Sequence, residues 1–213
     1  MWRGRAWFRY RCGSTINGMR SALLVIDIQE SFRQRPNWAG VNNPGIVGVV
    51  NQLVDDARSR GDLVVWVLHI EPGTGNVFDP AAGHDHVRYQ DGLEPLPGEP
   101  QLVKTSANAF TTTGLQQLLT TEGIRHVIVT GIQTEWCCET TTRIACDLGY
   151  EVTFVTEATA TFPAPHADER HRPFDEILAS PRTVPAAAMT ERTEYALNGR
   201  FATVATVKEV LAR

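Results

Sequence analysis

The stretch His126–Cys137, HVIVTGIQTEWC, begins with the character of a strand and ends with that of a helix start. Its apolar run at 127–129 is typical of a strand that is covered on both faces, as in a parallel sheet. Gly131 permits a sharp turn, and Thr134 is a candidate N-cap for a helix that follows. This order predicts a parallel α/β sheet, with Cys137 in the first turn of a helix that starts at its edge.

The same alternation of strand and helix extends along most of the chain. We expect strands at 21–28, 63–69, 101–105, 126–131 and 151–156, and helices at about 45–60, 113–122 and 135–148. Beyond residue 161, one or two helices within 167–198 precede a candidate last strand at 202–206 and a short terminal helix. This pattern predicts a single three-layer α/β/α domain with a mostly parallel sheet.

Residues 1–18 differ in composition from residues 19–213, which we expect to form the folded domain. The first segment carries four arginines and four aromatic residues but no acidic residue. It lacks a long apolar region, so a targeting leader is the weaker interpretation. Because Met19 directly precedes the first strand, we expect 1–18 to be a disordered basic extension or a product of an upstream start.

Composition favours one globular enzyme domain. The chain has 213 residues, 42% of them hydrophobic, and a net charge of −4. This charge gives no reason to expect nucleic acid or an anionic membrane as a partner, and no apolar run approaches the roughly 20 residues that span a bilayer. Four cysteines, two of them adjacent, do not resemble a secreted disulfide framework. We therefore expect a cytoplasmic protein.

Three side chains with complementary chemistry follow predicted strands. Asp27 ends the first strand, Lys104 ends the short strand at 101–105, and Cys137 follows the strand at 126–131. The carboxyl ends of parallel strands line one crevice, where small ligands bind, so these groups are expected to converge. A helix start and a nearby cation both favour a thiolate at Cys137. Taken singly, however, each residue has a structural alternative: a buried cysteine, a turn carboxylate and a surface lysine.

The segments around these residues resemble the three signature segments of the isochorismatase-like cysteine hydrolases, which include nicotinamidases, N-carbamoylsarcosine amidase and biuret hydrolase. The segments are VIDIQESF around Asp27, LVKTSANAF around Lys104 and GIQTEWCCETTTRIACDLGYEV around Cys137. The resemblance covers roughly residues 19–160 and implies a Rossmann-like isochorismatase hydrolase fold with an Asp27–Lys104–Cys137 triad. Cys138 departs from the family, which more often has an aliphatic residue there, but the Thr-x-x-Cys spacing from Thr134 selects Cys137 as nucleophile.

The resemblance also implies the surroundings of the triad. The backbone N–H groups of Gln133 and Cys137 would form an oxyanion hole, beside a non-proline cis peptide between Ile132 and Gln133. The substrate pocket would gather aromatic and imidazole side chains that suit a small flat or cyclic amide, namely Phe32, Phe110, Trp136 and His69, with Trp38 at its rim. We also expect a homo-oligomer, either a dimer or a tetramer, and a long 71–100 loop that covers the pocket or reaches a neighbouring subunit.

Cofactor dependence separates the functional hypotheses. Nicotinamidases of this family carry an Asp-x-His metal pair after the second strand, and the corresponding position here reads His69-Ile70-Glu71. We therefore expect no metal and no other cofactor, although other imidazole and carboxylate groups could form an alternative site, namely His69, Glu71, His84, Asp85 and His86. The leading hypothesis is a metal-independent cysteine hydrolase of a small C–N substrate. A metal-dependent nicotinamidase-like amidase and a catalytically silent small-molecule binder remain the alternatives.

Overall fold

The computed structural model describes residues 20–213, so the expected extension at 1–18 lies outside the described residues. The strands are β1 (Ala22–Ile26), β2 (Leu63–His69), β3 (Gln101–Lys104), β4 (His126–Ile132), β5 (Glu151–Ala160) and β6 (Thr203–Ala205). The α-helices are α1 (Glu30–Arg33), α2 (Ile46–Arg60), α3 (Leu115–Thr121), α4 (Glu139–Asp147), α5 (Phe174–Ala179), α6 (Ala186–Leu197) and α7 (Val207–Leu211). Short helical turns cover η1 (Pro36–Gly40), η2 (Thr134–Cys138) and η3 (Ala167–Glu169). None of the helices in this part of the chain combines the length and apolar composition needed to cross a membrane.

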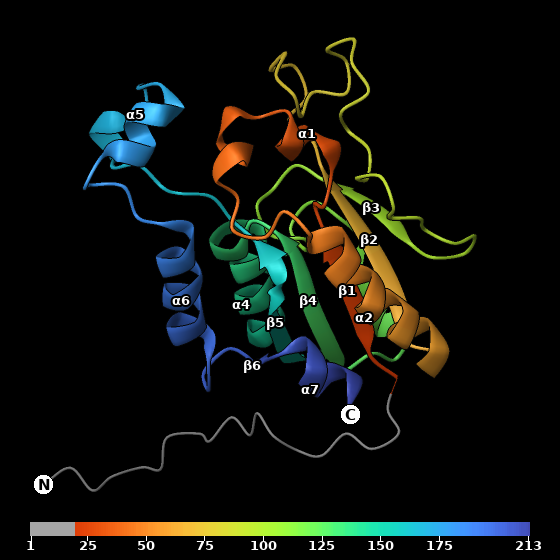
Figure 1. Ribbon diagram of the computed structural model, residues 1–213. Helices are drawn as coiled ribbons and strands as arrows, with labels where there is room; N and C mark the ends of the chain where they lie inside the picture. Colours follow the sequence, from red (N-terminus) through yellow and green to blue (C-terminus); the bar gives the residue numbers. More distant parts are fainter. Residues whose placement is uncertain (1–19) are drawn as a thin grey trace, which may run out of the picture.

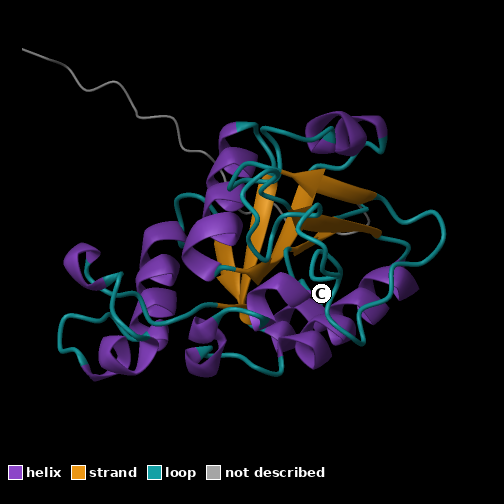
Figure 2. Ribbon diagram, turned by 90° about the horizontal axis from the view of Figure 1, so that it is seen from above, coloured by secondary structure: helices purple, strands orange, loops and turns teal. Residues whose placement is uncertain are grey.

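The six strands form one sheet in the order β3-β2-β1-β4-β5-β6, and every neighbouring pair is parallel. Figure 1 shows α2 crossing one face of this sheet, and Figure 2 shows helices on both sides of it. The prediction of a three-layer α/β/α domain is confirmed. This strand order reverses direction between β1 and β4, and crevices at such a reversal are where α/β sheets bind ligands.

Alternating side chains of the strands build a separate core on each face. In β1, Leu23 and Val25 pack with the apolar side of α2, whereas Leu24 and Ile26 pack with residues of α3 and α4. All four side chains are at most 1% exposed. Because strands of a parallel sheet are buried on both faces, their sequences read as continuous apolar runs. The sheet is therefore a fixed platform for the loops at its carboxyl edge.

Several predicted boundaries differ from the observed ones. The segment predicted as a helix over 135–148 begins with the π-helical turn η2, and α4 starts only at Glu139. The strand predicted over 151–156 continues to Ala160, because the β4–β5 pairing shifts between Val129 and Gly131 and then resumes. The predicted helix after Pro44 is confirmed as α2, with Gly61 in the left-handed conformation at its C-cap.

The long loop between β2 and β3 packs against the segment that follows β1. Within it, the backbone carbonyls of Arg88 and His86 accept hydrogen bonds from the N–H groups of Glu30 and Ser31, at 2.9 Å each. The N–H of Gln90 donates in turn to the carbonyl of Ile28 at 3.1 Å. The loop is thereby fixed beside the carboxyl end of β1, where Asp27 lies.

Candidate active site

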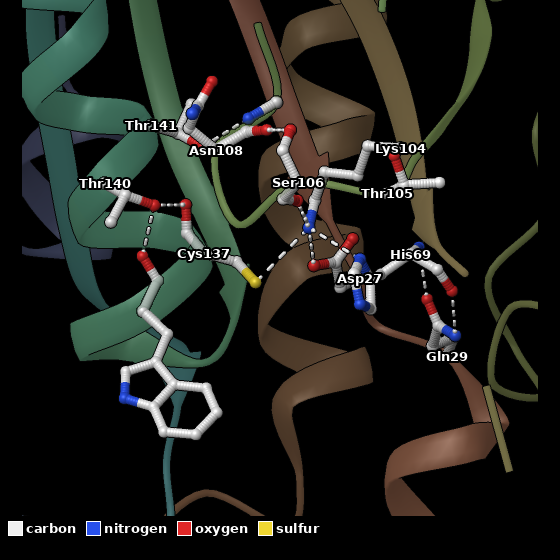
Figure 3. A network of polar contacts seen from close by, with 12 residues as sticks. Asp27, Gln29, His69, Lys104, Thr105, Ser106, Asn108, Cys137, Thr140 and Thr141 are labelled. Carbon is white, nitrogen blue, oxygen red and sulfur yellow. Dashed lines mark hydrogen bonds and ion pairs between the residues drawn. The ribbon is translucent and has the colours of Figure 1, made fainter. Parts of the chain in front are cut away.

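Three separate strands carry the predicted triad to one edge of the sheet. Asp27 directly follows β1, Lys104 ends β3, and Cys137 lies in η2 after β4. Lys104 Nζ lies 2.8 Å from Asp27 Oδ2 and 3.3 Å from Cys137 Sγ, so its ammonium lies between the carboxylate and the sulfur (Figure 3). The structure thus brings together the three residues that the sequence selected, although their sequence separations are large.

The three side chains are almost closed to solvent. Asp27 and Lys104 are 0% exposed, and Cys137 is 8% exposed. Lys104 Nζ also donates to the carbonyl of Ser106 at 3.0 Å. Burial without partners would be costly for both charges, so their mutual contact is what permits an ion pair at this depth.

The backbone at Asp27 has an unusual conformation. Its φ angle is +53°, and Asp27 is the one non-glycine residue with positive φ in the described range 20–213. Its N–H donates to the carbonyl of Val67 at 2.9 Å, and its carbonyl accepts from the N–H of Gln29 at 2.8 Å. A left-handed conformation at a non-glycine residue persists where surrounding bonds enforce it, and such positions cluster at functional sites.

Gly131 allows β4 to approach β1 directly below the site. Its φ is +132°, and a Cβ added there would lie 2.0 Å from the carbonyl oxygen of Ile26. Any other residue would therefore collide with backbone. The peptide bond between Ile132 and Gln133 is cis, as the resemblance implies. Glycine at 131 thus sets the close spacing between the Asp27 strand and the turn that holds Cys137.

The turn η2 differs from the helix start that the sequence suggested. Thr134 is not its N-cap: that position is Gln133, and the Thr134 hydroxyl instead donates to Thr159 Oγ1 at 2.9 Å. The Gln133 carbonyl accepts from the N–H groups of both Trp136, at 3.2 Å, and Cys138, at 3.1 Å. The N–H of Cys137, which stands between Trp136 and Cys138 in the sequence, takes part in neither of these two hydrogen bonds.

The electrostatics contradict the expected resting thiolate. Burial, reinforced by the nearby Asp27 carboxylate, raises the pKa of the Cys137 thiol well above its usual range, although Lys104 acts in the opposite direction. Burial also raises the pKa of Asp27, and the Lys104 ammonium offsets this only in part. For Lys104, burial lowers the pKa, but Asp27 and the Cys137 sulfur outweigh it and leave the pKa above its usual value. Burial thus favours the neutral thiol at Cys137, beside a carboxylate able to take its proton.

Two polar residues that the sequence reasoning missed brace the site. Gln29 is fully buried and binds the backbone of His69 through both ends of its amide: Oε1 accepts from the N–H at 2.7 Å, and Nε2 donates to the carbonyl at 3.0 Å. Glu135 accepts from Gln133 Nε2 at 3.2 Å and from the Thr161 hydroxyl at 2.6 Å. The sequence signal that could have found them is their position: each is a polar residue two positions away from Asp27 or Cys137.

The predicted pocket residues occupy different surroundings. Phe32 packs edge-to-face on Phe78 with ring centroids 5.0 Å apart, and Phe78 also contacts the His69 ring, at 5.7 Å. Trp136, which directly precedes Cys137 in the sequence, is 55% exposed to solvent. The ring of Phe110 instead stacks on Tyr150, at the amino end of β5, at 6.0 Å. Phe32 and His69 therefore lie in one connected cluster, which Phe110 does not join.

The alternative metal ligands do not converge on one point. His69 Nε2 lies 3.3 Å from Glu71 Oε1, while His84 and His86 stack on each other with centroids 4.1 Å apart. Among residues 20–213, no group of three or more histidine, cysteine, aspartate or glutamate side chains is arranged to hold a metal ion. The residues present therefore do not fit the metal centre of the nicotinamidase-like alternative.

Comparison with known proteins gives a consistent result. The family model for the isochorismatase domain matches residues 21–183. The uncharacterized isochorismatase family protein YddQ of Bacillus subtilis (strain 168) is 30% identical over 194 residues, which cover 91% of this chain and 99% of that protein. The ureidoacrylate amidohydrolase RutB of Enterobacter sp. (strain 638) is 29% identical over 178 residues, which cover 68% of this chain and 77% of that protein.

A solved structure extends the similarity to three dimensions. A putative hydrolase of the isochorismatase family from Chromobacterium violaceum superposes with a TM-score of 0.78 at 25% identity, covering 91% of this chain and 92% of that one. The six-stranded parallel sheet and the matched domain, which includes Asp27, Lys104 and Cys137, lead to the same conclusion. The chain belongs to the isochorismatase family of hydrolases.

Proposed function

We propose that this protein hydrolyses a C–N bond of a small amide, carbamoyl or urea-type molecule, with Cys137 as the nucleophile. The observation that carries the proposal is the buried contact of Lys104 Nζ with both Asp27 Oδ2 and Cys137 Sγ. A thiol, a carboxylate and an ammonium at these distances are the parts needed for covalent acyl transfer. The amidohydrolase RutB among the relatives supports a C–N bond as the target.

In the acylation half, Asp27 takes the proton from the Cys137 thiol as the sulfur attacks the carbonyl carbon. The raised pKa of Asp27, caused by burial, makes this carboxylate a stronger base than an exposed one. The tetrahedral intermediate then collapses as the C–N bond breaks, and Asp27 returns the proton to the departing nitrogen. The products of this half are a free amine or ammonia and a thioester on Cys137.

In the deacylation half, water attacks the thioester carbonyl and gives its proton to Asp27. The C–S bond then breaks, the acid product leaves, and the Asp27 proton returns to the sulfur. Lys104 stabilises the negative charge that develops on sulfur in both halves. The N–H groups of Gln133 and Cys137 would bind the oxyanion, and loss of one such donor typically costs about 100–1000-fold in rate.

The nearly closed site restricts the substrate to a small molecule. Cys137 is only 8% exposed, and the loop between β2 and β3 is hydrogen-bonded beside the carboxyl end of β1. The aromatic pair Phe32 and Phe78 and the adjoining His69 ring would offer aromatic surfaces to a flat substrate.

A panel of small amides, ureas and carbamoyl compounds, assayed by ammonia release, tests the proposal. We expect Cys137→Ala to abolish hydrolysis and Cys138→Ala to reduce it only moderately. Cys138 is 0% exposed, whereas the 8% exposed Cys137 is the one whose sulfur accepts from Lys104 Nζ, at 3.3 Å. Equal loss in the two variants, with both folded by circular dichroism, would reject Cys137 as the nucleophile, and substantial residual activity in Cys137→Ala would reject thiol chemistry altogether.

A further inference from the structure

The Lys104 ammonium has more acceptors than it has protons to give. It carries three N–H donors, but four acceptor groups lie within reach: Asp27 Oδ2 at 2.8 Å, the Ser106 carbonyl at 3.0 Å, Cys137 Sγ at 3.3 Å and His69 Nδ1 at 3.4 Å. The two shortest contacts are to oxygen. The third N–H is therefore shared between the Cys137 sulfur and the His69 ring.

His69 is held so that Nδ1 can accept. Its other ring nitrogen, Nε2, lies 3.3 Å from Glu71 Oε1, and a carboxylate can only accept, so the ring proton belongs on Nε2. Glu71 is in turn fixed by Asn76, whose Nδ2 donates to Glu71 Oε2 at 2.6 Å. Because His69 pairs with Lys104 in the β2–β3 register and Gln29 holds its backbone, the ring has a fixed position beside the ammonium (Figure 3).

We propose that His69 is a positioning residue that takes the third N–H of Lys104 whenever the Cys137 sulfur is acylated. This inference rests on the proposed function, because it concerns the thioester stage of that reaction. A thioester sulfur is conjugated with the acyl carbonyl and is a weaker acceptor than the sulfur of the resting thiol, so the N–H needs another partner at that stage. His69 supplies it, and the ammonium stays aligned for the second half of the reaction, when the thiolate leaves.

Competition between the sulfur and His69 gives the proposal a distinctive signature. In His69→Phe, the ring remains but the acceptor is lost, so the third N–H is left to the sulfur alone. This favours the thiolate in the resting enzyme, and we expect iodoacetamide to alkylate Cys137 about three- to tenfold faster, because the pKa of the thiol is lowered. Deacylation should slow by roughly tenfold, because the acyl state loses one charge-assisted hydrogen bond.

The experiment follows alkylation of Cys137 by peptide mapping and hydrolysis of p-nitrophenyl acetate by burst kinetics. In the second assay, the burst reports acylation and the steady rate reports deacylation. His69→Asn keeps an acceptor near the position of Nδ1, so its alkylation rate should match that of the wild type. The ratio of its steady rate to its burst rate should also be preserved, even where loss of the pocket ring lowers both rates. His171→Phe, at an exposed histidine, controls for the substitution itself. Glu71→Leu, at a half-exposed residue, should shift both rates in the same directions as His69→Phe but less, and it serves if His69→Phe does not fold.

The outcomes separate this role from a purely structural one. Loss of packing alone predicts that both rates change together, so an alkylation rate in His69→Phe that is unchanged or lower overturns the proposal. Faster alkylation in the smaller His69→Asn as well would assign the effect to access and also overturn it. If Cys137→Ala hydrolyses p-nitrophenyl acetate as fast as the wild type, the proposed function fails, while the alkylation comparison still decides whether His69 competes for the Lys104 proton.

Discussion

Replacement of Lys104 by methionine should destabilise the fold strongly, and in a way that depends on pH. Methionine matches the length of lysine but removes the charge that faces Asp27 at 2.8 Å, and both side chains are 0% exposed. Removal of one partner from a buried ion pair typically costs about 3–5 kcal/mol, because the other charge is left without compensation. Against a total stability of roughly 5–15 kcal/mol for a domain, this is a large share.

The pH dependence follows from the pKa of Asp27. Burial already raises this pKa, and Lys104 is the largest influence that lowers it, so the variant raises it further above the unfolded value. A carboxyl whose folded pKa exceeds its unfolded pKa loses stability as the pH rises through the folded value and regains it as the pH falls. The deficit of Lys104→Met should therefore be large near neutral pH and shrink in acid, where Asp27 is protonated.

Urea denaturation of the wild type and of Lys104→Met at about pH 8 and about pH 5 measures this deficit. The double variant Asp27→Asn/Lys104→Met should recover much of the lost stability at the higher pH, because no unpaired charge remains. A deficit below about 1 kcal/mol at the higher pH, or an equal deficit at both pH values, would refute a buried, charged Asp27–Lys104 pair.

Gly131→Ala should cost roughly 2–5 kcal/mol in urea denaturation, because its Cβ collides with the Ile26 carbonyl and its φ is +132°. Gly123→Ala is the matched control: its φ is +66° with nothing within 4 Å, so about 1–2 kcal/mol is expected, and equal losses would contradict the close approach of β1 and β4. Glu139→Gln should lower stability by about 1–3 kcal/mol, since the buried carboxylate accepts from Arg143, Arg192 and Thr193 and joins α4 to α6. An unchanged melting temperature in that variant would show that these bonds contribute nothing net.

The sequence predicted most of the sheet because its evidence is local. Apolar runs such as 127–129 mark buried strands, and the strand predicted there is confirmed as β4. The continuation of β5 to Ala160 could not be predicted in this way, because it depends on a register shift against β4. The turn η2 likewise depends on the Gln133 carbonyl accepting two N–H groups, which no residue pattern in the segment specifies.

The convergence of the triad was predictable, but its electrostatics were not. Residue types and strand ends indicated that Asp27, Lys104 and Cys137 meet at one edge. The raised pKa of the Cys137 thiol runs against the expected thiolate, because the helix start and the cation were considered without the burial of the sulfur. The three side chains come from separate strands of the sheet, and a linear pattern does not reveal how deeply they are buried where those strands meet.

The strand order also has a consequence for the folding pathway. Asp27 follows the central strand β1, whose two neighbours are β2, next in the chain, and β4, which begins about a hundred residues later. Parallel pairings between distant segments form slowly, because the entropy of loop closure is lost before the contacts are gained. Lys104 reaches its place only when β3 joins β2, and Cys137 only when β4 joins β1. We therefore expect the thiol to meet its partners at a late stage of folding, so that refolding intermediates contain much of the sheet but no assembled triad.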